Sequence, residues 1–527
     1  MVALVDAPTL KSWLSETGEI ALLDVREHGQ FGEGHLFFAV PLPYSRLELN
    51  LAALVPNPDV RIVLCDAGDG VAERAAARAE ALGYRNVNIL TGGVAAWKHA
   101  GYTLYAGVNV PSKTFGELIE YQKHTPRVTA QALQAMRDAN EDMVIVDGRP
   151  FAEYRKMSIP DGICCPNGEL VLRIRDIAPD PSTKIVINCA GRTRSIIGAQ
   201  TLIDFGIPNP VYALENGTQG WFLAGLDLER GASRRYLDAI STADIGALER
   251  RAHTLAEKHG VAFVSAADAH AWLADTSRTT YLLDVRAPEE YAKSPVSGFA
   301  HAPGGQLIQA TDQWVGVKGA RLVLIDAEGV RAPVVAAWLR QLGHEACVLD
   351  GGAAATAALD WRRPPRAPGA PAPRPMPVRE AADAIKTGAV QIIDLRASTS
   401  YRQGHIPQAV WSIRPRLATA IADPGKIVLL VADESGIAAL AALELAEAGC
   451  RDVRLLEGGC EAWQAAGLPV AATPDRPADG DCLDFLFFTH ARHDGDAKAA
   501  EAARQYLAWE IGLLDQLDAQ ERGAFRI

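Results

Sequence analysis

One short segment of the chain carries residue types that together could perform nucleophilic catalysis. It lies between an apolar run and a stretch of helical character over residues 196–205, and it reads Cys189, Ala190, Gly191, Arg192, Thr193, Arg194 and Ser195. A thiol attacks only as the thiolate, and at its ordinary pKa of about 8.5 only about 3% is ionised at pH 7. Free loop amides, a helix start and two arginines would favour the thiolate and would also hold an oxyanion. The segment therefore predicts covalent catalysis by Cys189 on an anionic substrate held by residues 190–195.

Cys189 also has a structural interpretation, since an isolated free cysteine is more often a small buried hydrophobe. Two arginines within five residues favour the functional interpretation, because packing alone does not require them. The catalytic assignment requires that the sulfur faces polar groups and not sealed aliphatic packing.

The cysteine segment belongs to a unit that occurs four times. An apolar run ending in Asp-x-Arg occurs at residues 24–26, 147–149, 284–286 and 394–396. A second apolar run follows at 62–65, 185–189, 322–326 and 427–431. A marker that begins with Leu closes each unit at 90–97, 214–221, 349–356 and 456–463. Three ordered markers in four copies indicate tandem repeats of one domain.

Buried strands alternating with helical stretches such as 72–82 and 196–205 indicate the α/β class. We expect four tandem domains, each a mainly parallel sheet with helices on both faces, followed by a helical C-terminal tail. The expected boundaries are 1–107, 125–230, 260–362, 376–474 and, for the tail, 475–527.

Three segments outside the repeats also have a character of their own. Residues 107–128 and 231–260 are expected to form helical connectors, whereas residues 362–375 are too rich in proline for helix or sheet and are expected to form an extended spacer. Residues 506–514 of the tail have apolar side chains at helical spacing. The tail is therefore expected to dock on a domain or on a second copy of the chain in a homodimer.

Length and charge exclude several classes of protein. A chain of 527 residues is too long for one domain, and no apolar run is long enough to span a bilayer, so no membrane partner is expected. The 52 basic and 64 acidic residues give a net charge of -12, which argues against nucleic acid as a partner. The N-terminal residues do not resemble a secretory signal, so a cytoplasmic location with eight free thiols is expected. The pair His490 and His493 is isolated, and no metal or cofactor is expected.

The ordered set of Asp-x-Arg, a cysteine loop and Leu-x-Gly-Gly-x-x-x-Trp resembles the rhodanese family, and residues 1–474 resemble four rhodanese-like domains. Residues 404–409 of the fourth copy are similar to a further signature of that family. The resemblance implies sulfurtransferase activity: the cysteine takes sulfur from a donor such as thiosulfate, becomes a persulfide, and passes the sulfur to cyanide or a thiol. It implies that Arg192 and Arg194 orient the donor and that Arg149 occupies a structural ion-pair position. Thiosulfate, 3-mercaptopyruvate, glutathione persulfide and protein persulfides all remain open as donors.

The other three copies depart from this pattern. Copy one keeps Cys65, but Asp66 and Asp69 would repel an anion and disfavour a thiolate. Copy three has Asp326 at the nucleophile position and retains Arg331, and copy four has Val431 or Ala432 there. Domain 2 is therefore predicted to be catalytic, domain 1 to lack activity, and domains 3 and 4 to be inactive.

The remaining cysteines have weaker interpretations. Cys164 and Cys165 could resolve a persulfide or disulfide on Cys189, or could be core filler. Packing roles are expected for Cys347, Cys450, Cys460 and Cys482.

Two alternatives to a sulfurtransferase stay open. Cysteine-dependent phosphatases of the same fold place five residues between the cysteine and the arginine, whereas four separate Cys189 from Arg194, which favours sulfur chemistry. The other alternative is a binding or regulatory protein in which even copy two is inactive.

Overall fold

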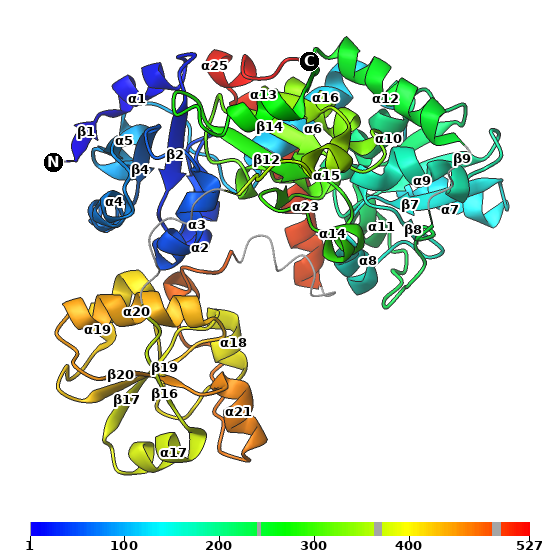
Figure 1. Cartoon of the computed structure of the whole chain (residues 1–527). Coiled ribbons are helices and arrows are strands. Elements are labelled where there is room, and N and C mark those ends of the chain that lie inside the picture. Colours follow the sequence, from blue (N-terminus) through cyan, green and yellow to red (C-terminus); the bar gives the residue numbers. More distant parts are fainter. Residues whose placement is uncertain (1, 240–243, 363–370, 487–496) are drawn as a thin grey trace. The chain divides into compact units, whose positions relative to one another are not determined.

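The computed structural model describes residues 2–239, 244–362, 371–486 and 497–527 (Figure 1). Each of the four repeats forms a five-stranded parallel sheet, and the strand order is the same in all of them: β1-β5-β4-β2-β3, β6-β10-β9-β7-β8, β11-β15-β14-β12-β13 and β16-β20-β19-β17-β18. The predicted α/β class, with four tandem domains that each contain a parallel sheet, is confirmed. The expected boundaries of the domains stay predictions.

Domains 1 and 2 contain equivalent elements in the same order. Domain 1 consists of β1 (Ala3–Val5), α1 (Ala7–Trp13), β2 (Ile20–Asp24), α2 (His28–Glu33), β3 (Val40–Pro41), η1 (Tyr44–Arg46), α3 (Leu47–Leu54), β4 (Arg61–Cys65), α4 (Val71–Ala81), β5 (Val87–Leu90) and α5 (Gly93–His99). Domain 2 consists of β6 (Arg127–Val128), α7 (Ala130–Asp138), β7 (Met143–Asp147), α8 (Phe151–Lys156), β8 (Ile163–Cys164), η2 (Asn167–Glu169), α9 (Leu170–Ile177), β9 (Lys184–Asn188), α10 (Thr193–Phe205), β10 (Val211–Leu214) and α11 (Gly217–Leu223).

Domains 3 and 4 repeat this order with small changes. Domain 3 consists of β11 (Ala262–Val264), α13 (Ala266–Ala271), β12 (Thr280–Asp284), α14 (Pro288–Lys293), β13 (Ala300–His301), α15 (Gly304–Gln309), η4 (Thr311–Gln313), β14 (Arg321–Ile325), α16 (Arg331–Gln341), β15 (Glu345–Leu349) and η5 (Gly352–Thr356). Domain 4 consists of β16 (Arg374–Met376), α17 (Val378–Lys386), β17 (Val390–Asp394), α18 (Ser398–Gln403), β18 (Val410–Trp411), η6 (Arg414–Arg416), α19 (Leu417–Ala420), β19 (Ile427–Val431), α20 (Ser435–Glu447), β20 (Val453–Leu456), α21 (Gly459–Ala465) and η7 (Asp479–Asp481).

Domain 4 shows how the apolar strands produce the layers. Side chains alternate between the two faces of a strand, so adjacent residues enter different cores. Ile392 packs with α17 and α21, whereas its neighbour Ile393 packs with α19 and α20. Figure 1 shows the sheet of this domain between these two pairs of helices. Apolar runs without polar alternation are therefore what a sheet buried on both faces requires.

The connectors and the tail are helical, as expected. The connectors form α6 (Val110–Lys123) and α12 (Ile245–Lys258), and the tail forms α23 (Ala497–Ile511), α24 (Leu513–Gln516) and α25 (Ala519–Arg522). The chain divides into two compact units. One unit pairs domains 1 and 4, and the other pairs domains 2 and 3 with both connectors and the tail, while residues 15–20 group with the second unit. The tail docks on α6 and α11 of its own chain.

One expectation about the proline-rich segment is wrong. Residues 374–376 form strand β16, which pairs in parallel with β20. Pro375 is accommodated because β16 is an edge strand, where the missing N–H costs no ladder bond on the open side. Residues 363–370 of the predicted spacer and the pair His490 and His493 lie outside the described residues. Within the part of the chain that is described, no helix is both long and apolar enough to cross a membrane.

An ion pair after the second strand of each domain is repeated four times. The arginine of each Asp-x-Arg motif binds the aspartate through two nitrogens and also donates to the carbonyl eight residues further on: Arg26 to Gly34, Arg149 to Met157, Arg286 to Ser294 and Arg396 to Gly404. In domain 2 the pair is buried, with Asp147 at 1% and Arg149 at 2% exposure. The motif thus fixes the turn that follows the strand.

We predict that Arg149→Leu lowers the free energy of unfolding by about 3–5 kcal/mol, because it leaves the buried Asp147 carboxylate without its partner. Urea-induced unfolding of the full chain measures the change. Arg362→Leu is a matched control, because Arg362 binds Asp360 in the same two-residue spacing but on the exposed surface. Equal changes in the free energy of unfolding of the two variants would contradict the role of burial.

Candidate active site

Cys189 lies directly after the central strand β9, and three residues separate it from Thr193, where α10 begins. Strand β9 lies between β10 and β7, so the cysteine is placed at the carboxyl edge of the sheet, where parallel sheets bind ligands. The side chain of Asn188 donates to Asp147, and the N–H of Gly148 donates to the Asn188 carbonyl. The end of β9 is therefore tied to the Asp-x-Arg turn on the neighbouring strand.

Helix α11 fixes the other side of the cysteine loop. The N–H groups of Thr218 and Gln219 donate to the carbonyls of Cys189 and Ala190 at 2.8 and 3.1 Å. Gly217 has a φ of +53°, and a Cβ atom there would lie 2.3 Å from the Cys189 carbonyl oxygen. Only glycine permits this close approach, so the loop carbonyls are directed toward α11.

The backbone N–H groups of the cysteine loop precede and begin helix α10. Among the described residues, no carbonyl or side chain accepts a hydrogen bond from the backbone N–H of residues 191–195. The Ser195 hydroxyl donates to the Cys189 sulfur at 3.1 Å. Donation to sulfur stabilises the thiolate, and free amides at a helix start suit an anion.

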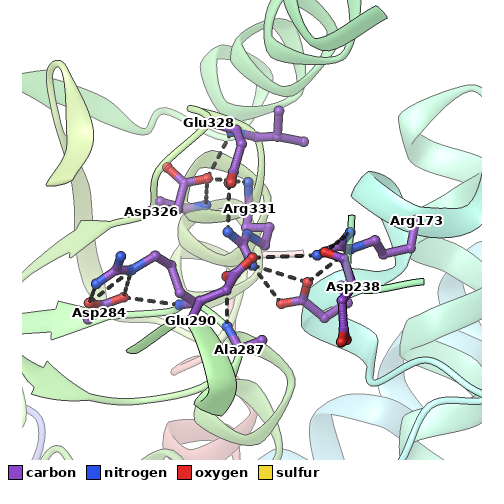
Figure 2. A network of polar contacts seen from close by, with 12 residues as sticks. Arg173, Asp238, Asp284, Ala287, Glu290, Asp326, Glu328 and Arg331 are labelled. Atoms are coloured by element: carbon purple, nitrogen blue, oxygen red, sulfur yellow. Dashed lines mark hydrogen bonds and ion pairs between the residues drawn. The ribbon is translucent and has the colours of Figure 1, made fainter. Parts of the chain in front are cut away.

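Domain 3 shows the same loop with its acceptor built in (Figure 2). The Asp326 carboxylate accepts from the N–H groups of four loop residues at 2.6–3.2 Å: Gly329, Val330, Arg331 and Ala332. In domain 1 the Asp66 carboxylate accepts from the N–H groups of Gly68 and Ala72. These loops hold an internal anion, so domain 2 differs from both in leaving its loop amides open.

Arg192 is neutralised by helix α6. Its guanidinium binds the Glu117 carboxylate at 2.7 and 2.8 Å and also contacts Glu120. Burial raises the pKa of Glu117 to about 7, and the neighbouring carboxylates Glu510 and Glu120 raise it as well, against the opposite effect of Arg192. Although burial acts against its charge, these carboxylates raise the pKa of Arg192 above its usual range. The guanidinium therefore holds the loop to the connector.

Arg194 is held more loosely. It binds Glu153 of α8 at 2.8 Å through two nitrogens and donates to the Gln306 amide oxygen of domain 3 at 3.4 Å. Burial lowers the pKa of Arg194, but the Glu153 carboxylate raises it, and the net value lies above its usual range. A thiolate at Cys189 would act on Arg194 in the same direction.

The tail helix reaches the same loop. The Thr193 hydroxyl donates to Glu510 at 2.8 Å, and Glu510 lies 3.4 Å from the Lys113 ammonium of α6. Glu510 is 1% exposed, and within the described part of the chain its second oxygen has no hydrogen-bond partner. That oxygen lies 3.1 Å from the position that a Cβ atom on Gly191 would take. The tail therefore closes one side of the cysteine loop.

Cys189 is shielded from bulk solvent, with 2% exposure, yet its closest polar contact is a hydroxyl. The other cysteines are also buried. Burial raises the pKa of the Cys164 thiol to about 12 and raises that of Cys165 well above its usual range. Cys164 lines a cavity of about 100 Å³ between domains 2 and 3, together with Gly148 and Gln306. A resolving role for these two thiols stays a prediction, and their raised pKa values disfavour it.

Burial also raises the pKa of the thiols Cys65, Cys347, Cys450, Cys460 and Cys482. At Cys65 the carboxylates of Asp24 and Asp66 add to this effect. The raised pKa values fit the packing roles expected for Cys347, Cys450, Cys460 and Cys482, and they fit the expectation that Cys65 does not form a thiolate. Within the described ranges, no group of three or more His, Cys, Asp or Glu side chains is arranged to hold a metal ion.

The structure brings all seven residues of the predicted loop together, and it adds four carboxylates that the sequence did not reveal: Glu117, Glu120, Glu153 and Glu510. A signal existed for Glu153. Copies two and three both carry Glu six residues after the aspartate of Asp-x-Arg and Arg five residues after the nucleophile position, whereas copies one and four carry neither. The roles of the loop residues in substrate binding stay predictions.

A cysteine at the end of a central parallel strand, with open amides before a helix, defines a class of α/β enzyme that binds an anion next to a nucleophile. The family model for the Rhodanese-like domain matches residues 6–100, 129–224, 265–358 and 377–466. The chain therefore belongs to the rhodanese family, the sulfurtransferase family with this fold.

Two relatives agree with this assignment. The chain is 42% identical to a crystal structure of thiosulfate sulfurtransferase from Pseudomonas aeruginosa, with a TM-score of 0.91 and complete coverage of both chains. It is also 27% identical over 106 residues to a protein named sulfurtransferase from Allochromatium vinosum, which covers 20% of this chain and 97% of that protein.

We predict that Glu117→Gln removes a pH dependence of stability. Because the pKa of Glu117 in the folded chain is about 7 and its ordinary value is 4.5, the folded protein binds more protons than the unfolded chain in this interval. The contribution of Glu117 to the free energy of unfolding therefore falls as the pH rises from 5 to 7. Over this range the free energy of unfolding of Glu117→Gln should rise by about 2 kcal/mol relative to that of wild type. Urea unfolding at both pH values measures it; a constant difference between the proteins would refute the assignment.

Proposed function

We propose that the chain is a sulfurtransferase that moves sulfane sulfur through a persulfide on Cys189. The observation that carries the proposal is the open set of loop amides beside a thiol that accepts a hydrogen bond from Ser195. A carboxylate fills the corresponding amides in domain 3 and in part in domain 1, and domain 4 has no cysteine at this position. Among the described residues, domain 2 is the one in which a thiol at the end of the central strand lies beside loop amides that no carboxylate accepts from.

The reaction has two balanced steps. The Cys189 thiolate attacks the outer sulfur of thiosulfate, the S–S bond of the donor breaks, and sulfite leaves with the bonding electrons. The outer sulfur remains on Cys189 as a persulfide. An acceptor thiolate or cyanide then attacks that sulfur, takes it, and restores the Cys189 thiolate.

The surrounding residues have separate parts in these steps. The N–H groups of residues 191–195 hold the negative charge of the donor and then of the persulfide. Ser195 stabilises the thiolate that leaves in the second step. Arg194 supplies positive charge beside the sulfur, whereas Arg192 anchors the loop to Glu117. The low exposure of Cys189 limits loss of the persulfide to bulk water and reductants.

We predict that incubation of the full chain with thiosulfate adds one sulfur atom to the peptide that contains Cys189, as measured by mass spectrometry. Cys189→Ser should abolish the adduct, while Cys65→Ser, which alters the buried thiol of domain 1, should leave it intact. If wild type forms no adduct with thiosulfate or with the other sulfane-sulfur donors, the proposed sulfurtransferase activity is refuted. A binding protein would then be favoured.

We further predict that Arg194→Ala raises KM for thiosulfate by about 10-fold to 100-fold, because a hydrogen bond to a charged group contributes about 1.5–3 kcal/mol. Steady-state sulfite release measures the change. Arg155→Ala is a matched control, since it removes the same charge from an exposed position on α8. Equal KM values for wild type and Arg194→Ala would show that the loop amides alone bind the donor.

A further inference from the structure

Domains 2 and 3 face each other through equivalent elements. Helix η2 packs against α15, and a Cβ atom on Gly168 would lie 2.7 Å from the backbone nitrogen of Gly305. Glu169 lies 22 residues after Asp147, and Gln306 lies 22 residues after Asp284, so the two residues hold the same position in their domains. Each of the two side chains contacts the arginine in the loop of the other domain: Glu169 contacts Arg331, and Gln306 contacts Arg194. The interface therefore has approximate two-fold symmetry.

Glu169 reaches the inactive site of domain 3. Its carboxylate binds Arg331 at 2.9 and 3.1 Å. Arg331 also binds Glu290 at 2.5 Å and Glu328 at 2.6 Å, and its side chain is 0% exposed. Figure 2 shows Glu290 and Glu328 converging on this guanidinium. Glu169 and Glu290 also pair with the buried Arg173, so three carboxylates surround two guanidinium groups, and Asp326 fills the loop beside Arg331.

Gln306 reaches the active site of domain 2 in the reciprocal way. Arg194 holds the position of Arg331, since each lies five residues after the nucleophile position, and it donates to the Gln306 amide oxygen. The residue equivalent to Glu328 is Gly191. Within the described residues, Glu153 is the one carboxylate in an ion pair with Arg194, and Asp147, the other carboxylate near it, is paired with Arg149.

We propose that Gln306, contributed by the inactive domain 3, is a positioning residue that sets the affinity of the Cys189 site for an anionic sulfur donor. Its neutral amide contacts the Arg194 guanidinium without adding a second carboxylate to the one that Glu153 supplies, so that Arg194 can still attract the donor and the thiolate. A carboxylate at this position would enclose Arg194 as Glu169 helps to enclose Arg331. The effect on the sulfur donor rests on the proposed function. The effect on the ionisation of Cys189 rests on the contact between Gln306 and Arg194.

The test compares three variants of the full chain. Gln306→Glu changes charge with almost no change in size, Gln306→Leu removes the acceptor without adding charge, and Glu169→Gln makes the mirror change at the inactive site. For Gln306→Glu we expect about a 10-fold rise in KM for thiosulfate with kcat nearly unchanged. Glu169→Gln should leave KM at the wild-type value, and Gln306→Leu should change it by less than threefold.

A second measurement does not depend on turnover. Iodoacetamide is uncharged, so the pH dependence of its reaction with Cys189, followed on the Cys189 peptide by mass spectrometry, reports the ionisation of the thiol alone. Gln306→Glu should shift this profile to higher pH, because the added charge disfavours the thiolate. Thermal unfolding of each variant verifies that the fold is retained.

These measurements separate the two proposals. If wild type transfers sulfur from no donor, the proposed function fails, and the alkylation profile alone decides the role of Gln306. An unchanged profile and an unchanged KM in Gln306→Glu would overturn the inference. Equal effects of Gln306→Glu and Gln306→Leu would also overturn it, because packing and not charge would then be responsible.

Discussion

The N–H groups that begin a helix after a buried strand need an acceptor, and the way in which each domain supplies one determines its chemistry. In domain 3 the acceptor is the Asp326 carboxylate, which completes the turn from within. In domain 1 Asp66 supplies part of the same bonding. In domain 2 a thiol precedes the turn and the amides remain open. A carboxylate in place of the thiol therefore preserves the fold, while it removes the nucleophile and takes up the loop amides.

The parts of the molecule that the sequence predicts are those set by neighbouring residues. Apolar runs predict the strands of a sheet covered on both faces, and the spacing from Asp147 to Arg149 is sufficient for the two side chains to pair. The order of strand, cysteine and helix places Cys189 at the carboxyl edge of the sheet. The strand at Pro375 was not predicted, because a strand tolerates proline only at the edge of a sheet. The local sequence does not show which strand lies at the edge.

The remaining features of the site come from residues that are far apart in the chain. Glu117 lies 75 residues before Arg192, Gln306 lies 112 residues after Arg194, and Glu510 lies 317 residues after Thr193. Two arginines in a row of seven residues predict a strongly cationic loop, but charge in a folded protein depends on the partners that the fold brings close. Connector α6 and tail helix α23 supply carboxylates that no local pattern links to the loop. The deep burial of Cys189 likewise depends on segments that are far apart in the chain.

The pairing of domains within each unit allows a copy without a cysteine at the nucleophile position to have a physical role at its neighbour. Packing acts only at contact, whereas a charge acts over several ångströms where the surroundings are of low polarity. One side chain at the interface can therefore affect the neighbouring site even after its own domain has lost the nucleophile. Around Arg331 and its neighbour Arg173, the carboxylates of Glu169, Glu290 and Glu328 provide three negative charges for two guanidinium groups. Around Arg194 the corresponding interface residue is neutral, and among the described residues Glu153 supplies the carboxylate that pairs with it. The two sites therefore differ in the number of carboxylates at the arginine, and the interface residue of the neighbouring domain accounts for part of that difference.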